Sequence, residues 1–306
     1  MRTHDLTDFI WAIQESWLLR LQSRSVIGLL ESQITVDVEV VDLEAKQGGV
    51  AKVNGSVTVL PVRGLISQRD SIFSQIFGGT STERLGAQFD AAMNSDQVKG
   101  IVLDIDSPGG TTYGVQELAE KIFQARGQKP IIAVANSLAA SAAYWIGSAA
   151  DKLMVTPGGD VGSIGVYCLH EDWSKADETA GVKTTLVSAG KYKVEANPWE
   201  PLSEDARQAL QDGVDATYGE FVAAVAKHRG VSSSVVRSGF GQGRTVRSKE
   251  AVAEGMADRV ASLGKVLDEM GVQRSAGLRA ESHGDPDVLR RKLKLRGLCE
   301  SVQSET

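Results

Sequence analysis

Three stretches of the chain carry the residue types that nucleophilic catalysis needs. Ser141 stands in an alanine-rich run at the start of an expected helix, whose N-terminal dipole would stabilise negative charge beside the hydroxyl. Pro108-Gly109-Gly110 follows an apolar run and is expected to lead directly into another helix, so its bare backbone N–H groups could bind an oxyanion. Lys191 and Lys193 follow a further apolar run and could supply a base.

Each stretch alone also has an ordinary structural explanation. Pro-Gly-Gly is common in strand–helix turns, a serine among alanines suits close helix packing, and lysines after a strand are usually solvated. Lys191 and Lys193 lie two apart, so in an extended segment they point the same way and the pattern does not choose between them. The order of all three stretches along one layered system favours catalysis.

Short apolar runs alternate with amphipathic stretches from Ser56 onward, which is typical of a layered α/β domain. Each of the three stretches then lies at or just after the end of an expected strand. The ends of neighbouring strands lie at one edge of a sheet, so functional side chains can gather there. Strands are expected at 57–62, 100–105, 131–136, 152–156, 163–167 and 184–188.

The stretches between these strands predict helices. Thr80 and Glu83 fit a capping box, and an apolar stripe runs through 115–123. The small-residue segment 141–150 suits a closely packed helix. Ser203 is expected to cap a long helix that carries acidic residues in its first turn.

The chain divides into three parts. Residues 1–54 are expected to form an N-terminal helical extension, 55–270 the α/β domain, and 271–306 a charged C-terminal tail. The expected N-terminal helix rests on apolar residues at helical spacing: Phe9, Ile10, Ile13, Trp17 and Leu18.

The composition is that of a globular protein and excludes several classes. The 306 residues are 42% hydrophobic and 24% charged, with a net charge of −6 and no clustered basic surface for nucleic acid. Cys168 and Cys299 make no metal pattern and read as free thiols. No run approaches the roughly 20 apolar residues of a membrane span, and no signal peptide is recognisable. We therefore expect a cytoplasmic location.

The order of the motifs resembles that of the protease IV (signal peptide peptidase A) family of serine peptidases, over roughly residues 55 to 265. Several matching pieces are individually weak, but their order is specific. The pieces are Val98-Lys99-Gly100-Ile101, Asp106-Ser107-Pro108-Gly109-Gly110, Ala140-Ser141 with Tyr144, Gly162-Ser163-Ile164-Gly165-Val166 and Gly190-Lys191-Tyr192-Lys193.

This resemblance implies a ClpP/crotonase-like fold and a serine endopeptidase with a Ser/Lys dyad, without cofactor or metal. Ser141 would be the nucleophile and Lys193 the base, and Ser163 is a candidate to orient the lysine. The backbone N–H groups around Gly109, Gly110 and Ala142 would form the oxyanion hole. Where many relatives have glycines after the serine, this chain has Ala142-Ala143.

The segments 191–194 and 198–203 look most like the soluble branch encoded by tailed phages and prophages, whose members process scaffold and portal proteins during head assembly. That branch implies protein substrates, a location in the host cytoplasm and a homo-oligomeric ring with active sites lined by neighbouring copies.

Three other functions remain open from the sequence. His170 lies downstream of Ser141, so a ClpP-like Ser-His-Asp hydrolase can be drawn. A crotonase-type acyl-CoA enzyme also builds an oxyanion hole from backbone N–H groups. The third alternative is a non-catalytic assembly scaffold, which the N-terminal extension and the charged tail would suit.

Overall fold

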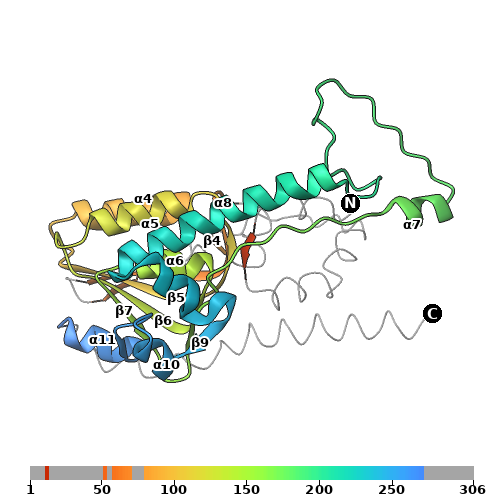
Figure 1. The fold of residues 1–306 in the computed structure, drawn as a ribbon. Helices are drawn as coiled ribbons and strands as arrows, with labels where there is room; N and C mark the ends of the chain where they lie inside the picture. Colours follow the sequence, from red (N-terminus) through yellow and green to blue (C-terminus); the bar gives the residue numbers. More distant parts are fainter. Residues whose placement is uncertain (1–10, 14–50, 54–56, 71–78, 272–306) are drawn as a thin grey trace, which may run out of the picture.

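The computed structural model describes residues 11–13, 51–53, 57–70 and 79–271, and its centre is one mixed β-sheet (Figure 1). The main strand order is β10-β7-β6-β5-β3-β2, in which β2 alone runs antiparallel to its neighbour. These strands are β2 (Ala51–Val53), β3 (Val57–Ser67), β5 (Gly100–Thr111), β6 (Ile131–Ala140), β7 (Lys152–Val155) and β10 (Arg259–Val260).

Four short strands extend this sheet at the carboxyl ends of the long ones. β4 (Gly79–Ser81) pairs with β3, and β8 (Asp160–Gly162) pairs with β6. β9 (Thr245–Arg247) pairs with β8, and β1 (Trp11–Ile13) pairs with the end of β5. The carboxyl ends of β5 and β6 therefore lie among several short strands.

Helices cover both faces of the sheet. Alternate residues of β5 point to opposite faces, and each face packs against its own hydrophobic core. Ile101, Leu103 and Ile105 face the core beneath α4 (Thr82–Asn94), α5 (Val115–Gln124), α6 (Ala142–Ser148) and α8 (Glu204–Arg229). Val102 faces a smaller core closed by α11 (Leu263–Glu269). The remaining helices are α7 (Ser174–Thr179), α9 (Ser233–Ser238), the 3-10 turn Phe240–Gly243 and α10 (Ser248–Ala253).

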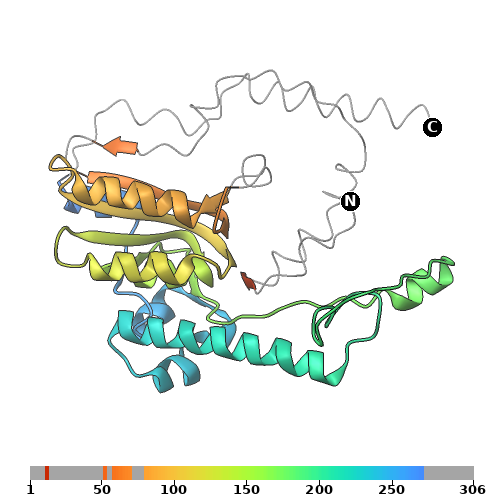
Figure 2. The same ribbon diagram turned by 90° about the horizontal axis from the view of Figure 1, so that it is seen from above.

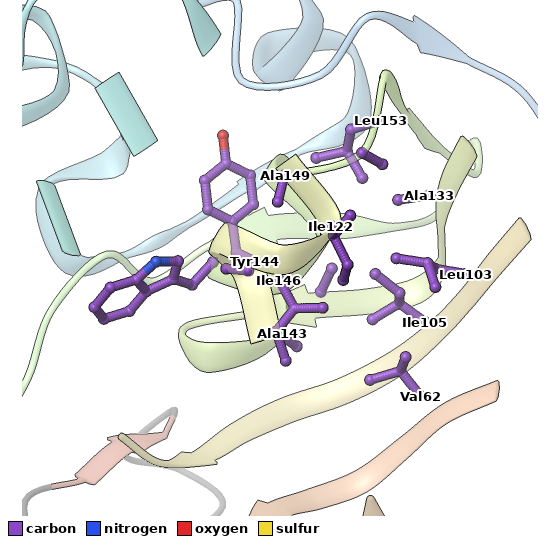
Figure 3. Close-up of a cluster of buried hydrophobic side chains, with 14 of the residues drawn as sticks. Val62, Leu103, Ile105, Ile122, Ala133, Ala143, Tyr144, Ile146, Ala149 and Leu153 are labelled. Carbon is purple, nitrogen blue, oxygen red and sulfur yellow. The ribbon is translucent and has the colours of Figure 1, made fainter. Parts of the chain in front are cut away.

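Helix α6 is the centre of the larger core. All of its residues are buried, and Figure 3 shows side chains of α6 packed against those of β5, β3 and α5. The labelled residues are Ala143, Tyr144 and Ile146 of α6 and Ala149 just after it, with Leu103, Ile105, Val62 and Ile122, beside Ala133 and Leu153. This burial fixes the helix that begins after Ser141.

A long excursion, residues 165–203, leaves the domain between β8 and α8; we call it the arm. It contains no buried residue, and Figures 1 and 2 show it projecting well beyond the sheet together with the first half of α8. Most of the buried residues of α8 lie in its last turns, which contact the core. Among the described residues, no helix is both long and apolar enough to cross a membrane.

The expected α/β fold is confirmed, as are the strands at 57–62, 100–105, 131–136 and 152–156 and the long helix capped by Ser203. The strand expected at 163–167 is wrong, because Gly162 and Ser163 adopt positive φ angles of 114° and 54° that end the extended path. The strand expected at 184–188 is wrong as well, because that part of the arm is exposed and pairs with no described strand.

Two local expectations also need correction. Ser81, rather than Thr80, is the N-cap of α4, since its hydroxyl accepts the N–H of Arg84 while Thr80 bonds the backbone of Arg63. Trp11–Ile13 is a strand and not part of a helix, because its backbone pairs with β5. The rest of the expected N-terminal helix, and the tail after 271, lie outside the described residues.

Candidate active site

Ser141 occupies a sharp turn between β6 and α6. Its φ and ψ are 56° and −121°, a conformation that non-glycine residues rarely adopt. Its N–H donates to Gly162 O at 2.7 Å, and its hydroxyl makes no cap but lies 3.5 Å from Gly165 O. Strained strand-to-helix turns of this type present nucleophiles in other hydrolases. In this structure the side chain of Ser141 is fully buried.

The helix after Ser141 is held from both sides. Tyr144 donates its hydroxyl to Met256 O at 2.9 Å, and the ring of Trp145 stacks on Phe221 with centroids 4.5 Å apart. Burial raises the pKa of Tyr144, so the phenol remains a neutral donor. The N–H of Ala142 lies in the first turn of α6, where no preceding helical carbonyl can accept it. It is therefore suited to bind a developing negative charge.

The sequence predicted that the Pro-Gly-Gly stretch leads directly into a helix, and this is wrong, because the stretch belongs to β5. β5 continues to Thr111, and α5 begins only at Val115. The strand can continue because Gly110 packs against β3, where a Cβ atom would come within 1.9 Å of Ile66 O. No other residue fits there without moving the backbone.

The strand register brings this glycine pair to the serine. Ser107 of β5 pairs with Ala139 of β6, so Gly109 and Ser141 each lie two residues beyond the same pair. Ser107 was not singled out by the sequence analysis, although it belongs to the matched motif. Its hydroxyl accepts the N–H of Gly109 at 3.1 Å and donates to Gly64 O at 2.6 Å. Ser107 therefore holds the glycine turn in place.

Ser163 also lies near the nucleophile. It follows Gly162, whose carbonyl binds the N–H of Ser141, and it is 8% exposed. Its own N–H donates to Arg244 O at 2.8 Å. The structure thus brings together Ser141, Ala142, the glycine pair and Ser163.

Lys193 is not brought to Ser141 within one copy of the chain. It lies on the arm between α7 and α8, which projects beyond the sheet (Figure 1), and it is exposed. Lys191 is also exposed, with Nζ 4.6 Å from the ring centroid of Tyr192. His170 lies on the arm too, where its Nε2 is 3.2 Å from Asn197 O. None of these three candidate bases therefore contacts the nucleophile in a single chain.

Peptidase family S49 matches residues 124–276, a range that runs from the end of α5 through α11 and includes Ser141 and the arm. The chain belongs to peptidase family S49. With the layered sheet described above, this assignment confirms the ClpP/crotonase-like fold class and the resemblance to the signal peptide peptidase A family.

Several S49-type relatives are similar over most of the domain. Capsid assembly protease C of Escherichia phage lambda is 34% identical over 215 residues, which cover 70% of this chain and 48% of that protein. Head-tail preconnector protein GP5 of Enterobacteria phage P21 is 32% identical over 230 residues, covering 75% and 46%. The putative signal peptide peptidase SppA of Enterococcus faecium is 28% identical over 220 residues, covering 71% and 63%. The chain thus spans about half the length of the two phage relatives.

Proposed function

We propose that the chain is a serine endopeptidase that hydrolyses peptide bonds with Ser141 as nucleophile and Lys193 as base. The observation that carries this proposal is the strained turn at Ser141, set at the end of β6 level with Gly109. Membership of a peptidase family supports hydrolysis of an amide rather than the acyl-CoA chemistry of a crotonase.

The catalytic steps follow from this arrangement. Lys193 in its neutral form removes the hydroxyl proton as Ser141 Oγ attacks the substrate carbonyl carbon. The negative charge that develops on the carbonyl oxygen is bound by the N–H of Ala142 and by the glycine pair. The leaving amine takes the proton from Lys193, and water then hydrolyses the acyl-enzyme by the same route. Ser163 would orient the lysine.

The lysine would come from a neighbouring copy of the chain. A lysine base needs an apolar, water-poor setting beside its nucleophile, and Lys193 lacks one within a single copy. The arm exposes large apolar side chains whose burial would favour association: Trp173, Val182, Leu186, Val187 and Tyr192. Packing of the arm on a second copy would bury these side chains and deliver Lys193. We therefore expect a homo-oligomer.

The substrates we propose are phage or prophage head proteins, such as scaffold or portal proteins, in the cytoplasm of the host. The support is the similarity to two phage proteins, one named a capsid assembly protease and the other a head-tail preconnector protein.

The test is cleavage of a denatured protein substrate, followed by mass spectrometry of the products. The wild-type chain should yield peptides and should be phosphonylated at Ser141 by a serine-directed reagent. Ser141→Ala should lose both properties, whereas Ser137→Ala, four residues earlier on β6, should keep both. A wild-type chain that neither cleaves nor reacts would instead support the assembly-scaffold function.

A further inference from the structure

The strand edge beside the proposed nucleophile is already occupied by the chain itself. Gly109 and Gly110 pair with Leu65 and Ile66 of β3 on one side. On the other side β6 stops pairing with β5 after Ala139, because the chain turns at Ser141 into α6. β1 pairs with β5 along this vacated edge (Figure 2, red strand).

The register of β1 places Ile13 opposite Gly109, the residue of β5 that lies level with the proposed nucleophile. β1 runs antiparallel to β5, with Trp11 opposite Thr111, Ala12 opposite Gly110 and Ile13 opposite Gly109. Gly109 is level with Ser141, so Ile13 is the residue of β1 whose carbonyl lies at that level, and the strand runs toward the serine. The complete burial of Ser141 fits an edge that is filled.

We propose that Trp11–Ile13 is a built-in occupant of the substrate-binding edge, which a substrate must displace. This inference rests on the proposed function, since it takes Ser141 as the nucleophile. The ligand recognised is an extended peptide that adds a strand to the edge of β5, where backbone hydrogen bonds supply the affinity. A tethered segment competes at an effective concentration in the millimolar range, so it lowers the apparent affinity for an added peptide.

A reversible cross-link tests this occupancy. Opposite residues of an antiparallel pair have Cα atoms about 4.5–5.5 Å apart, within the range that a disulfide spans. Trp11→Cys and Thr111→Cys are combined with Ser141→Ala, which prevents cleavage, and with serines at Cys168 and Cys299. The probe is a fluorescent peptide with the sequence of residues 8–16. Oxidation should form the bond and weaken probe binding at least tenfold, and reductant should restore it.

The matched control carries Trp11→Cys alone and should bind the probe equally with and without oxidant. The proposal is overturned if no disulfide forms, or if it forms and leaves probe binding unchanged. A second variant replaces Trp11, Ala12 and Ile13 by proline in the active chain, which removes every N–H of the strand. Because the competing strand is lost, this variant should have a lower KM and the same kcat as the wild type. An unchanged KM would contradict the proposal.

These outcomes are distinguishable from failure of the proposed function. Probe binding is measured with Ser141→Ala and requires no catalysis. If the wild-type chain cleaves nothing while the cross-link still blocks the probe, the peptidase proposal fails and the occupancy stands. If the chain cleaves peptides and the cross-link has no effect on probe binding, the occupancy fails alone.

Discussion

The backbone at Ser141 is strained, and the contacts around it hold the strain in place. Positive φ at a non-glycine residue of this kind costs on the order of 1–3 kcal/mol. The bond from its N–H to Gly162 O and the burial of α6 oppose relaxation. Glycine would fit this turn better than serine. The presence of serine therefore indicates a functional role that outweighs its cost in stability.

This strain predicts different stabilities for two inactive variants. Ser141→Gly should raise the free energy of unfolding by about 1 kcal/mol, because glycine adopts this conformation without steric cost. Ser141→Ala keeps the Cβ atom and should stay near the wild-type value. Urea denaturation of the three proteins measures the difference. A glycine variant no more stable than the alanine variant would show that the turn is unstrained.

The identity of the base is a second question at the residue scale. Lys193→Ala should lose essentially all peptidase activity, whereas Lys191→Ala and His170→Ala should keep a substantial fraction. A dyad lysine must be neutral to accept a proton, so the wild-type rate should rise with pH until that lysine has titrated. An inactive His170→Ala with an active Lys193→Ala would replace the dyad by a Ser-His-Asp triad.

His228 contributes to stability and not to the site. Its Nδ1 lies 2.9 Å from Ser148 Oγ, whose proton goes to Trp145 O, so the neutral imidazole donates Nδ1–H to Ser148. Burial, followed by the positive charge of Arg126, lowers the pKa of His228 to about 4. The folded state thus favours the neutral ring.

This shift predicts a loss of stability in mild acid. The unfolded chain takes up a proton near the ordinary histidine pKa of about 6.5, while the folded chain resists until about pH 4. The contribution of His228 is therefore present above pH 6.5 and lost as the pH falls toward 4, with a magnitude on the order of 3 kcal/mol. In His228→Gln, the free energy of unfolding measured by urea denaturation should fall less steeply between pH 6.5 and 4 than in the wild type. An equally steep fall in the variant would contradict the assignment.

At the scale of elements, sequence pattern predicted the central strands well, because continuous apolar runs are typical of a parallel sheet buried on both faces. It failed where tertiary contacts decide the backbone. The turn at Gly162 and Ser163 ends β8 just where a further strand was expected to begin, and Gly109–Gly110 extend β5 because β3 approaches so closely. A short apolar pattern around Ile13 looked helical and became a strand through pairing with β5.

The close approach of β3 to β5 gives a prediction for one glycine of the sheet. Gly110→Ala should destabilise the protein by at least 1–3 kcal/mol and remove activity, because its Cβ would meet backbone atoms of Ile66 that cannot move alone. Gly219→Ala in α8 is the matched control, since nothing lies within 4 Å of its added Cβ. It should raise the free energy of unfolding by about 0.5–1 kcal/mol through helix propensity. Urea denaturation that gives both changes the same sign would contradict this account.

At the scale of the whole molecule, the sequence predicts a site whose residues one copy of the chain does not all bring together. Ser141, the glycines and Ser163 come together because the strands that carry them are neighbours in one sheet. Lys193 follows them in sequence, but the arm takes it away from the sheet (Figure 2). A sequence motif gives the order of residues and does not say which copy supplies each one.

A site shared between copies predicts recovery of activity from inactive chains. Ser141→Ala and Lys193→Ala, unfolded and refolded together at equal amounts, should form some sites with an intact Ser141 from one copy and an intact Lys193 from its neighbour. Random assembly into a closed ring makes about a quarter of the sites complete, so about a quarter of the wild-type activity should return.

The control mixes wild-type chains with equal amounts of the double variant Ser141→Ala, Lys193→Ala. If the lysine comes from the neighbour, about a quarter of the sites remain complete, since both partners must be intact. If serine and lysine belong to the same copy, half of the activity remains, and the two single variants give none when mixed. Static light scattering on the same samples reports the oligomer. A monomer with full activity at micromolar concentration would contradict the shared site directly, because its arm would have to fold back to carry Lys193 to its own serine.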